Sequence, residues 1–362
     1  MKILIAPNIL YAKESAAYYL TRSLLDIFKE SGDTVAVSAD KANGFRNASL
    51  YPCTPLKAPL FNFNADNRSY EEYLYSIGAS SRKYLEADTA SLIETIRHFK
   101  PDWVLAIDRT AAMIAARAEG VRCGVFVNSA MYRNAYFPSK CLRSVNEILS
   151  GMQYEQVFDM KTLLNKCDVR FLFSPASVHP FPDSASTYRL KAMTSSPSTS
   201  RHQSRITIAL HHLNDSAGSI YRLLNEAFKG APYQVYAGFH NAHILTEDNM
   251  HYIELSRKDM LDDAMAVIHD GSEYYYHECT ARAIPQLIIA SHEYPRLFFA
   301  QAARRSGIGD YIFEEDLDVS TLYEAFRKMI GDDTCLERCL AVQKESERLP
   351  DLHAIRRILE TR

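Results

Sequence analysis

The two halves of the chain open with the same pattern, a short continuous apolar run followed by a loop and an amphipathic helix. In the first half the run is residues 2–6 and the helix is expected over 18–28. In the second half the run is residues 205–210 and the helix is expected over 220–228. Continuous apolar runs that each precede a helix are typical of parallel strands buried on both faces. The sequence therefore predicts an α/β fold made of two doubly wound domains.

The length of the chain and one polar segment indicate where the domains divide. A chain of 362 residues exceeds the size at which a single hydrophobic core usually stops growing. The low-complexity run at residues 194–200 cannot pack into a core. We therefore expect a first domain over 1–193, a linker over 194–204, a second domain over 205–345, and a C-terminal helix within 346–362 that could pack back on the first domain. Doubly wound sheets bind ligands beyond the carboxyl ends of their strands, so the cleft between the domains is the expected site.

The composition argues against several classes of protein. A formal net charge of −3 does not supply the basic face that binding to a nucleic acid backbone needs. No apolar run approaches the length of a membrane span, and the N-terminal run is too short and strand-like for a signal peptide, so we expect a cytoplasmic protein. The seven cysteines are an odd number scattered from Cys53 to Cys339, which fits free thiols better than a disulfide framework.

The stretch from residue 264 to 290 reads as strand, small-residue turn, helix and strand. Gly271 permits a backbone conformation that a β-carbon would penalise, and Ser272 is a good residue for a helix start. The unpaired N–H groups and the positive dipole at such a helix end favour a phosphate group. Glu278, about two turns into the helix, is placed to accept hydrogen bonds from ribose hydroxyls. An ordinary βαβ turn without a ligand explains the same residues, so the motif alone leaves both interpretations open.

On these residues the chain resembles the nucleotide-sugar glycosyltransferases of the GT-B fold, specifically the UDP-glycosyltransferase family and its bacterial natural-product members. The resemblance is carried by the order of segments in the second half, namely residues 250–255, Leu261, residues 266–271, Glu278, Pro285 and Gln301. It implies two Rossmann-like domains that face a cleft, with the donor bound by the second domain. It also implies that His269 and the backbone of Asp270 and Gly271 hold the donor diphosphate. Ser272 belongs to the same group, and Glu278 binds the ribose.

The sequence departs from this family at several points. Asp270 replaces the usual small residue, and the residues that read the base have no clear equivalent around positions 256–258, so the base stays open between uracil and thymine. The family's catalytic histidine belongs between Pro7 and Ala16, whereas the first histidine of this chain is His98.

The missing histidine leaves two carboxylates as candidates for the general base. A group that removes the proton of the acceptor hydroxyl contributes about a hundredfold to ten-thousandfold to the rate. Glu14 lies in the loop where the family keeps its histidine. Asp108 ends an apolar run in the first half, where the family places a strand-end Asp in the cleft. Each has a plain alternative, because Asp108 could cap the following helix and Glu14 could be a solvated charge at a helix start.

Other loops supply further candidates. The resemblance places small hydroxyl residues against the donor phosphates after the first strand of the second half, which corresponds to Ser216 with Gly218. Aromatic residues are dense between positions 45 and 84, where such enzymes build the acceptor pocket, and Tyr132 and Tyr136 follow the strand after Asp108 and could close it. Packing beneath long loops explains these rings equally well.

The sequence thus predicts a glycosyltransferase that moves a sugar from a UDP- or dTDP-linked donor to a small-molecule acceptor with inversion. The resemblance implies that it needs no metal and no cofactor besides the nucleotide-sugar co-substrate. The alternatives are an isomerase like the nucleotide-sugar 2-epimerases and an inactive accessory subunit that kept the fold. We expect neither a nucleic acid partner nor a membrane span, and a homodimer remains open.

Overall fold

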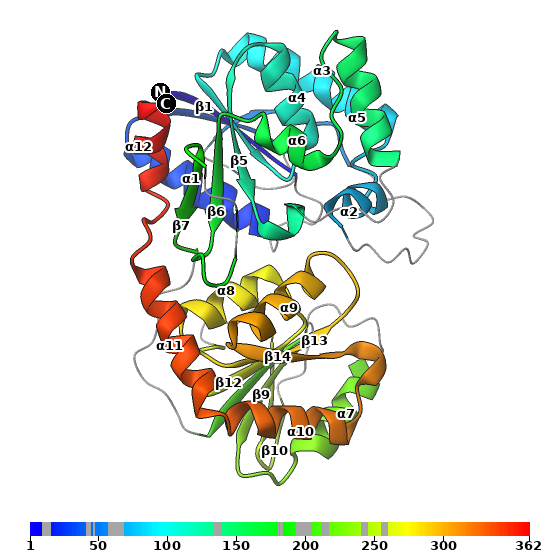
Figure 1. Cartoon of the computed structure of the whole chain (residues 1–362), viewed down its shortest axis with the longest axis vertical. Coiled ribbons are helices and arrows are strands. Elements are labelled where there is room, and N and C mark those ends of the chain that lie inside the picture. Colours follow the sequence, from blue (N-terminus) through cyan, green and yellow to red (C-terminus); the bar gives the residue numbers. More distant parts are fainter. Residues whose placement is uncertain are drawn as a thin grey trace. The chain divides into compact units, whose positions relative to one another are not determined.

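The structure is a computed structural model that describes the chain outside eleven short gaps. The gaps are residues 9–15, 41–44, 46–47, 57–68, 133–139, 180, 182–183, 193–203, 211–216, 240–244 and 255–259. The backbone divides into two compact units (Figure 1). The first unit contains Met1–Phe173, Phe181–Leu190 and Pro350–Arg362, and the second contains Ser174–Pro180 and Lys191–Leu349. The chain therefore enters the second unit briefly at residues 174–180 and returns to the first with its last residues. The linker expected over 194–204 lies almost entirely outside the described residues.

The first unit is built on a parallel sheet. Its seven described strands lie in the order β3-β2-β1-β4-β5-β6-β7, and each neighbouring pair is parallel. The strands are β1 (Lys2–Pro7), β2 (Thr34–Ser38), β3 (Ser49–Tyr51), β4 (Trp103–Ile107), β5 (Arg122–Val127), β6 (Val169–Phe173) and β7 (Thr187–Leu190). Every residue of β4 is buried, as expected for a central strand of a sheet covered on both faces.

Helices connect these strands. They are α1 (Ala16–Glu30), α2 (Tyr70–Ser76), α3 (Arg82–Phe99), α4 (Thr110–Ala118), the 3-10 helix η2 (Ser129–Tyr132), α5 (Lys140–Gly151), α6 (Met160–Asn165) and, from the C-terminus, α12 (Ala354–Thr361). Two polar contacts fix α12 to this unit. The buried indole of Trp103 donates to the carbonyl of Leu359 at 3.2 Å, and Arg356 forms an ion pair with Asp33 at 2.9 Å.

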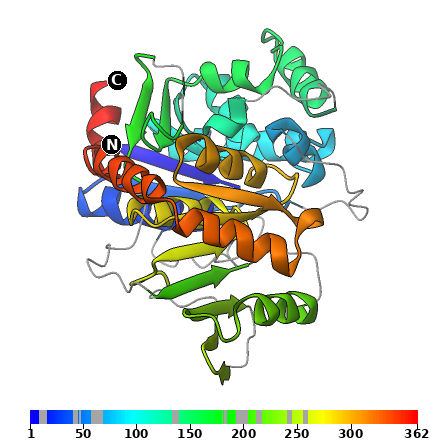
Figure 2. The same cartoon turned by 60° about the horizontal axis from the view of Figure 1, so that its bottom comes forward.

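The second unit repeats the arrangement. Its seven described strands lie in the order β10-β11-β9-β8-β12-β13-β14, and only β10 is antiparallel to its neighbour. The strands are β8 (Arg205–Ala209), β9 (Gln234–Phe239), β10 (Leu245–Glu247), β11 (Met250–Glu254), β12 (Ala266–His269), β13 (Gln286–Ala290) and β14 (Gly309–Phe313). The helices are α7 (Ala217–Phe228), α8 (Glu273–Ala281), α9 (Arg296–Ser306), η3 (Glu314–Asp316), α10 (Val319–Ile330) and α11 (Asp333–Glu347). Helix α9 packs against β13 and β14 (Figure 2).

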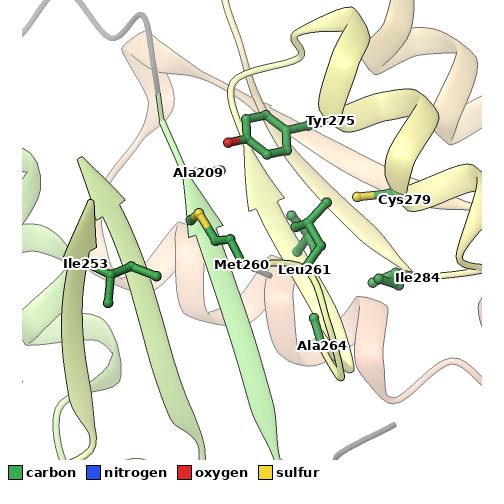
Figure 3. Packing of buried hydrophobic residues seen from close by; sticks show 9 residues of the cluster. Ala209, Ile253, Met260, Leu261, Ala264, Tyr275, Cys279 and Ile284 are labelled. Carbon is green, nitrogen blue, oxygen red and sulfur yellow. The ribbon is translucent and has the colours of Figure 1, made fainter. Parts of the chain in front are cut away.

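A buried apolar cluster holds α8 on the second sheet. It joins residues from the ends of strands, from the segment before β12 and from α8, namely Ala209, Ile253, Met260, Leu261, Ala264, Val267, Tyr275, Cys279 and Ile284. Figure 3 shows the ring of Tyr275 reaching from α8 over Met260 and Leu261 toward the strand that ends at Ala209. Burial of each large apolar side chain stabilises the fold by about 1.5–3 kcal/mol. The first turn of α8 is therefore fixed relative to the strand ends beside it.

The prediction of two doubly wound α/β domains is confirmed. Among the parallel strands of each sheet the order reverses once, between β1 and β4 in the first unit and between β8 and β12 in the second. Loops at such a reversal leave the sheet in opposite directions and open a crevice, which is where open α/β sheets bind ligands. The loops after β4 and β12 are therefore the places to look for a site. No helix among the described residues is long and apolar enough to cross a membrane.

Candidate functional site

The turn after β12 requires a glycine. Gly271 has φ +76°, and a β-carbon there would lie 3.1 Å from Cγ2 of Ile288 and 3.2 Å from Cβ and the carbonyl oxygen of Arg296. Any other residue would add a steric conflict to a strained backbone conformation. Ser272 then caps α8, because its hydroxyl accepts the N–H of Tyr275 at 3.4 Å. The sequence prediction of a Gly turn and a Ser helix start at this point agrees with the structure.

The side chain of His269 is part of this turn. The ring is fully buried, its Nδ1 accepts the N–H of Gly271 at 3.1 Å, and its Nε2 lies 2.9 Å from Oε1 of Gln286. Burial lowers the pKa of the ring below its usual value, and the hydrogen bond to Gln286 and the charge of Asp270 oppose that shift. The ring is therefore neutral at physiological pH and has a hydrogen-bond partner at both nitrogens.

Asp270 also folds onto the backbone. It is fully buried, and its Oδ1 accepts the N–H of Ser272 at 3.1 Å. An aspartate bonded to the amide two residues ahead forms a turn of its own. The polar side chains of this turn thus shape the backbone that leads into α8. The positive end of the α8 dipole follows at Glu273.

Glu278 lies further along α8 in a buried ion pair. It is 1 % exposed, and its Oε2 is 3.0 Å from Nε of Arg282. Nη1 of Arg282 reaches Asp262 at 2.6 Å, so the guanidinium ties the helix to the segment before β12. A ribose contact by Glu278 would have to be made by a carboxylate that already engages Arg282.

In the first unit Asp108 directly follows β4. Its φ of +53° places it in the left-handed region, which Asp tolerates better than most residues. The loop after β1 holds it there, because Asn8 donates from its backbone to the carbonyl of Ile107 at 2.8 Å and from its side chain to the carbonyl of Asp108 at 3.2 Å. Helix α4 begins at Thr110 with Arg109 as its N-cap residue. The interpretation of Asp108 as that cap is therefore wrong.

Arg109 forms a buried network that the sequence did not predict. Its guanidinium binds Asp88 through two contacts, at 2.6 and 2.8 Å, and donates to the carbonyl of Ser38 at 2.8 Å. Arg109 is 3 % exposed and Asp88 is fully buried. The hydroxyl of Tyr84 also donates to Asp88, at 3.3 Å. The residue next to Asp108 is thus anchored to β2 and α3. No local pattern signals this network, because the partners of Arg109 lie 21 and 71 residues away.

Two more groups lie near the carboxyl ends of this sheet. Tyr132, in η2 after β5, donates to Asn165 at 2.9 Å, and its ring meets that of Phe181 at 4.4 Å. Burial raises the pKa of its hydroxyl. Glu71 of α2, which also contacts η2, is buried and accepts the backbone N–H of Met160 at 2.9 Å, and burial raises its pKa as well. The sequence analysis missed Glu71, whose burial depends on helices distant in sequence.

A cavity of about 250 Å³ lies at the opposite ends of the strands of this sheet. Arg122 and Cys123, which begin β5, and Asp168, which precedes β6, are among its lining residues. It lies at the amino ends of these strands and so does not belong to the site at Asp108.

Comparisons with solved structures match the chain over its whole length. The glycosyltransferase VinC in complex with dTDP is 17 % identical with a TM-score of 0.72, and the match covers 100 % of this chain and 99 % of VinC. The spinosyn rhamnosyltransferase SpnG complexed with thymidine diphosphate is 14 % identical with a TM-score of 0.75, covering 99 % of this chain and 100 % of SpnG. The glycosyltransferase SnogD from Streptomyces nogalater is 16 % identical with a TM-score of 0.68, and both chains are covered completely. This chain has the GT-B fold. No protein-family model and no curated protein matched the sequence.

The GT-B fold gives each unit one turn at the reversal of its strand order, and the two turns differ chemically. In the second unit the turn leads into a positive helix end, which suits a phosphate. In the first unit the turn carries the carboxylate of Asp108, which suits proton transfer.

Several predicted site residues lie outside the described part of the GT-B chain. These are Glu14, Ser216 and Tyr136. Gly218 is the second residue of α7, directly after the gap that contains Ser216. Among the residues that the structure describes, no three His, Cys, Asp or Glu side chains are grouped as a metal site.

Proposed function

We propose that this protein is a glycosyltransferase that moves a sugar from a nucleoside diphosphate donor to a small-molecule acceptor with inversion at the anomeric carbon. The observation that carries the proposal is the turn at 269–272, where a glycine with φ +76° leads into the N-terminus of α8 at the strand reversal of the second unit. A helix start of this kind favours a diphosphate. The fold shared with VinC and SpnG, whose structures contain dTDP, supports the same ligand class.

The donor would be held by the second unit. The positive N-terminal end of α8 would bind the diphosphate, together with the segment of Ser216 and Gly218, while the N–H groups of Gly271 and Ser272 hold the turn in shape through His269 and Asp270. The same groups would offset the negative charge that grows on the leaving diphosphate, which is why we propose a reaction without a metal ion. Glu278 would accept a ribose hydroxyl.

The acceptor would be activated by the first unit. A carboxylate, Asp108 or Glu14, would take the proton of the acceptor hydroxyl while its oxygen attacks the anomeric carbon. The bond from that carbon to the diphosphate oxygen breaks in the same step, and the nucleoside diphosphate leaves. A single displacement of this kind inverts the anomeric carbon. Tyr132 and Tyr136 would line the acceptor side.

Nucleotide binding by the intact protein tests the proposal. Ligand at about a hundred times its Kd should stabilise the protein by about 2.7 kcal/mol, so dTDP or UDP should raise the melting temperature while thymidine at the same concentration should not. Turnover is then measured with dTDP- or UDP-linked sugars and a panel of hydroxylated small molecules. Binding without transfer to any acceptor would favour an accessory subunit, and isomerised sugar without acceptor would favour an epimerase. Absence of nucleotide binding would overturn all three.

A further inference from the structure

Three residues on three neighbouring strands form one line of contacts that leads to Gly271 in the turn at 269–272. Gln286 begins β13, the strand beside β12, and is fully buried. Gly309 is its neighbour on β14, where a β-carbon would lie 2.0 Å from the carbonyl oxygen of Gln286 and 2.8 Å from its Cγ. Only glycine at 309 therefore leaves room for Gln286. The amide of Gln286 in turn reaches Nε2 of His269 at 2.9 Å, and Nδ1 of His269 accepts the N–H of Gly271.

The hydrogen bonds of this line allow one protonation state of the ring. The N–H of Gly271 donates to Nδ1, so Nδ1 carries no proton. The proton of the neutral ring then lies on Nε2 and is donated to Oε1 of Gln286. Turning the amide would bring its NH₂ group against that proton, so the Gly271 contact also fixes the orientation of Gln286. A protonated ring would lose the bond to Gly271.

A neutral, fully buried ring is poorly suited to contact a diphosphate. It has no positive charge to offer, and both nitrogens already have partners. The groups that remain to meet a phosphate are main-chain N–H groups at the start of α8, and their placement depends on the φ of Gly271.

We propose that Gln286 and His269 are a positioning pair that sets the backbone of the phosphate-binding turn, so that His269 acts on the donor through Gly271 and not by contact with the diphosphate. This inference rests on the proposed function, because it assigns a role within the donor site. It departs from the role that the family resemblance implies for His269. It also gives Gln286 a part in donor binding, which no sequence motif indicated.

Substitutions at both positions test the inference through the Kd of dTDP and UDP, measured by calorimetry on the full chain. His269→Ala removes the acceptor for Gly271 and should weaken binding roughly tenfold, and Gln286→Met, similar in volume, should weaken it roughly three- to tenfold. In His269→Asn the side-chain oxygen can again accept the amide two residues ahead, so the Kd should return to within about threefold of wild type. The double variant His269→Ala/Gln286→Met should bind no worse than His269→Ala, because the two residues act as a unit.

A second His–Gln pair in the same unit serves as the matched control. Oε1 of Gln234, the first residue of β9, lies 2.8 Å from Nε2 of His251 in β11. Both strands lie on the side of β8 away from β12. Gln234→Met should leave the Kd unchanged. A direct contact between ring and diphosphate would instead make His269→Asn as weak as His269→Ala and leave Gln286→Met like wild type, which overturns the inference. Failure of the wild type to bind either nucleotide overturns the proposed function itself.

Spectroscopy on the wild type keeps the test independent of whether a variant folds. Nitrogen-15 labelling of histidine distinguishes the two neutral tautomers and the cation. We expect His269 to show a proton on Nε2 alone, both free and with dTDP bound. A cationic ring, or a proton on Nδ1, in the dTDP complex would overturn the inference.

Discussion

The turns after β4 and β12 follow the reversals of strand order in two similar, mainly parallel sheets, yet they present different chemistry. In the second unit the left-handed residue is Gly271, and the adjoining side chains of His269 and Asp270 are turned inward onto the backbone. In the first unit the left-handed residue is Asp108, which carries a carboxylate. A glycine turn with inward side chains leads into a positive helix end, whereas an aspartate turn adds a titratable group. The comparison teaches that the same position in two similar sheets can be built from residues of different chemistry.

A buried ion pair accompanies each turn, but at different distances from it. Arg109 is adjacent to Asp108 in sequence and is held by Asp88, so its anchor fixes the turn itself. Arg282 lies at the far end of α8 and is held by Glu278 and Asp262, so its anchor fixes the helix that follows the turn. The second turn must therefore be ordered by other means, and the contacts of His269 and Gly271 provide them.

The largest expected effect is on turnover in Asp108→Asn. Asn is nearly isosteric and also tolerates a positive φ, so the melting temperature should stay near wild type. If Asp108 is the general base, kcat should fall about a hundredfold or more while the Kd of the donor is unchanged. Glu14→Gln is the matched variant, and kcat and melting temperature are measured on both. Full activity of the Asn variant with a dead Gln variant would move the role to Glu14.

The next largest effect is expected in Gly271→Ala. The left-handed conformation costs a β-carbon about 1–2 kcal/mol, and the contacts with Ile288 and Arg296 add about 1–3 kcal/mol. The backbone can relieve this strain only by moving, so donor binding should weaken together with stability. Gly230 is the control, since it has φ +75° in the same unit and nothing within 4 Å of a β-carbon. Gly230→Ala should lower the melting temperature and leave the Kd unchanged. Equal effects on the Kd in both variants would contradict a special role of the turn.

Much of the fold could be predicted from the sequence, because its signals are local. The continuous apolar runs marked β1 and β8, and Gly271 with Ser272 marked the start of α8. The surroundings of the site residues could not be predicted, because partners distant in sequence decide them. Burial lowers the pKa of His269, and the position of the ring is held by Gln286, 17 residues away. Asp108 leaves the capping position to Arg109, which is held by a carboxylate from another helix. Sequence motifs thus identify the positions of candidate site residues. Contacts with residues distant in sequence determine how the side chains at those positions are oriented.

The smallest effect is expected in Glu278→Gln. This variant tests whether α8 binds the donor through a side chain as well as through its backbone. The carboxylate of Glu278 already engages Arg282, so a ribose hydroxyl would have to reach a buried ion pair on a residue that is 1 % exposed. Gln keeps the shape and one acceptor, so we expect the Kd of UDP to rise only about three- to tenfold. Stability should fall by about 1 kcal/mol, since Arg282 retains Asp262. Asp262→Asn removes the other carboxylate of Arg282 and should lower the melting temperature without changing the Kd. Identical Kd values for the two variants would assign Glu278 to the ion pair alone and leave nucleotide binding at this turn to the backbone.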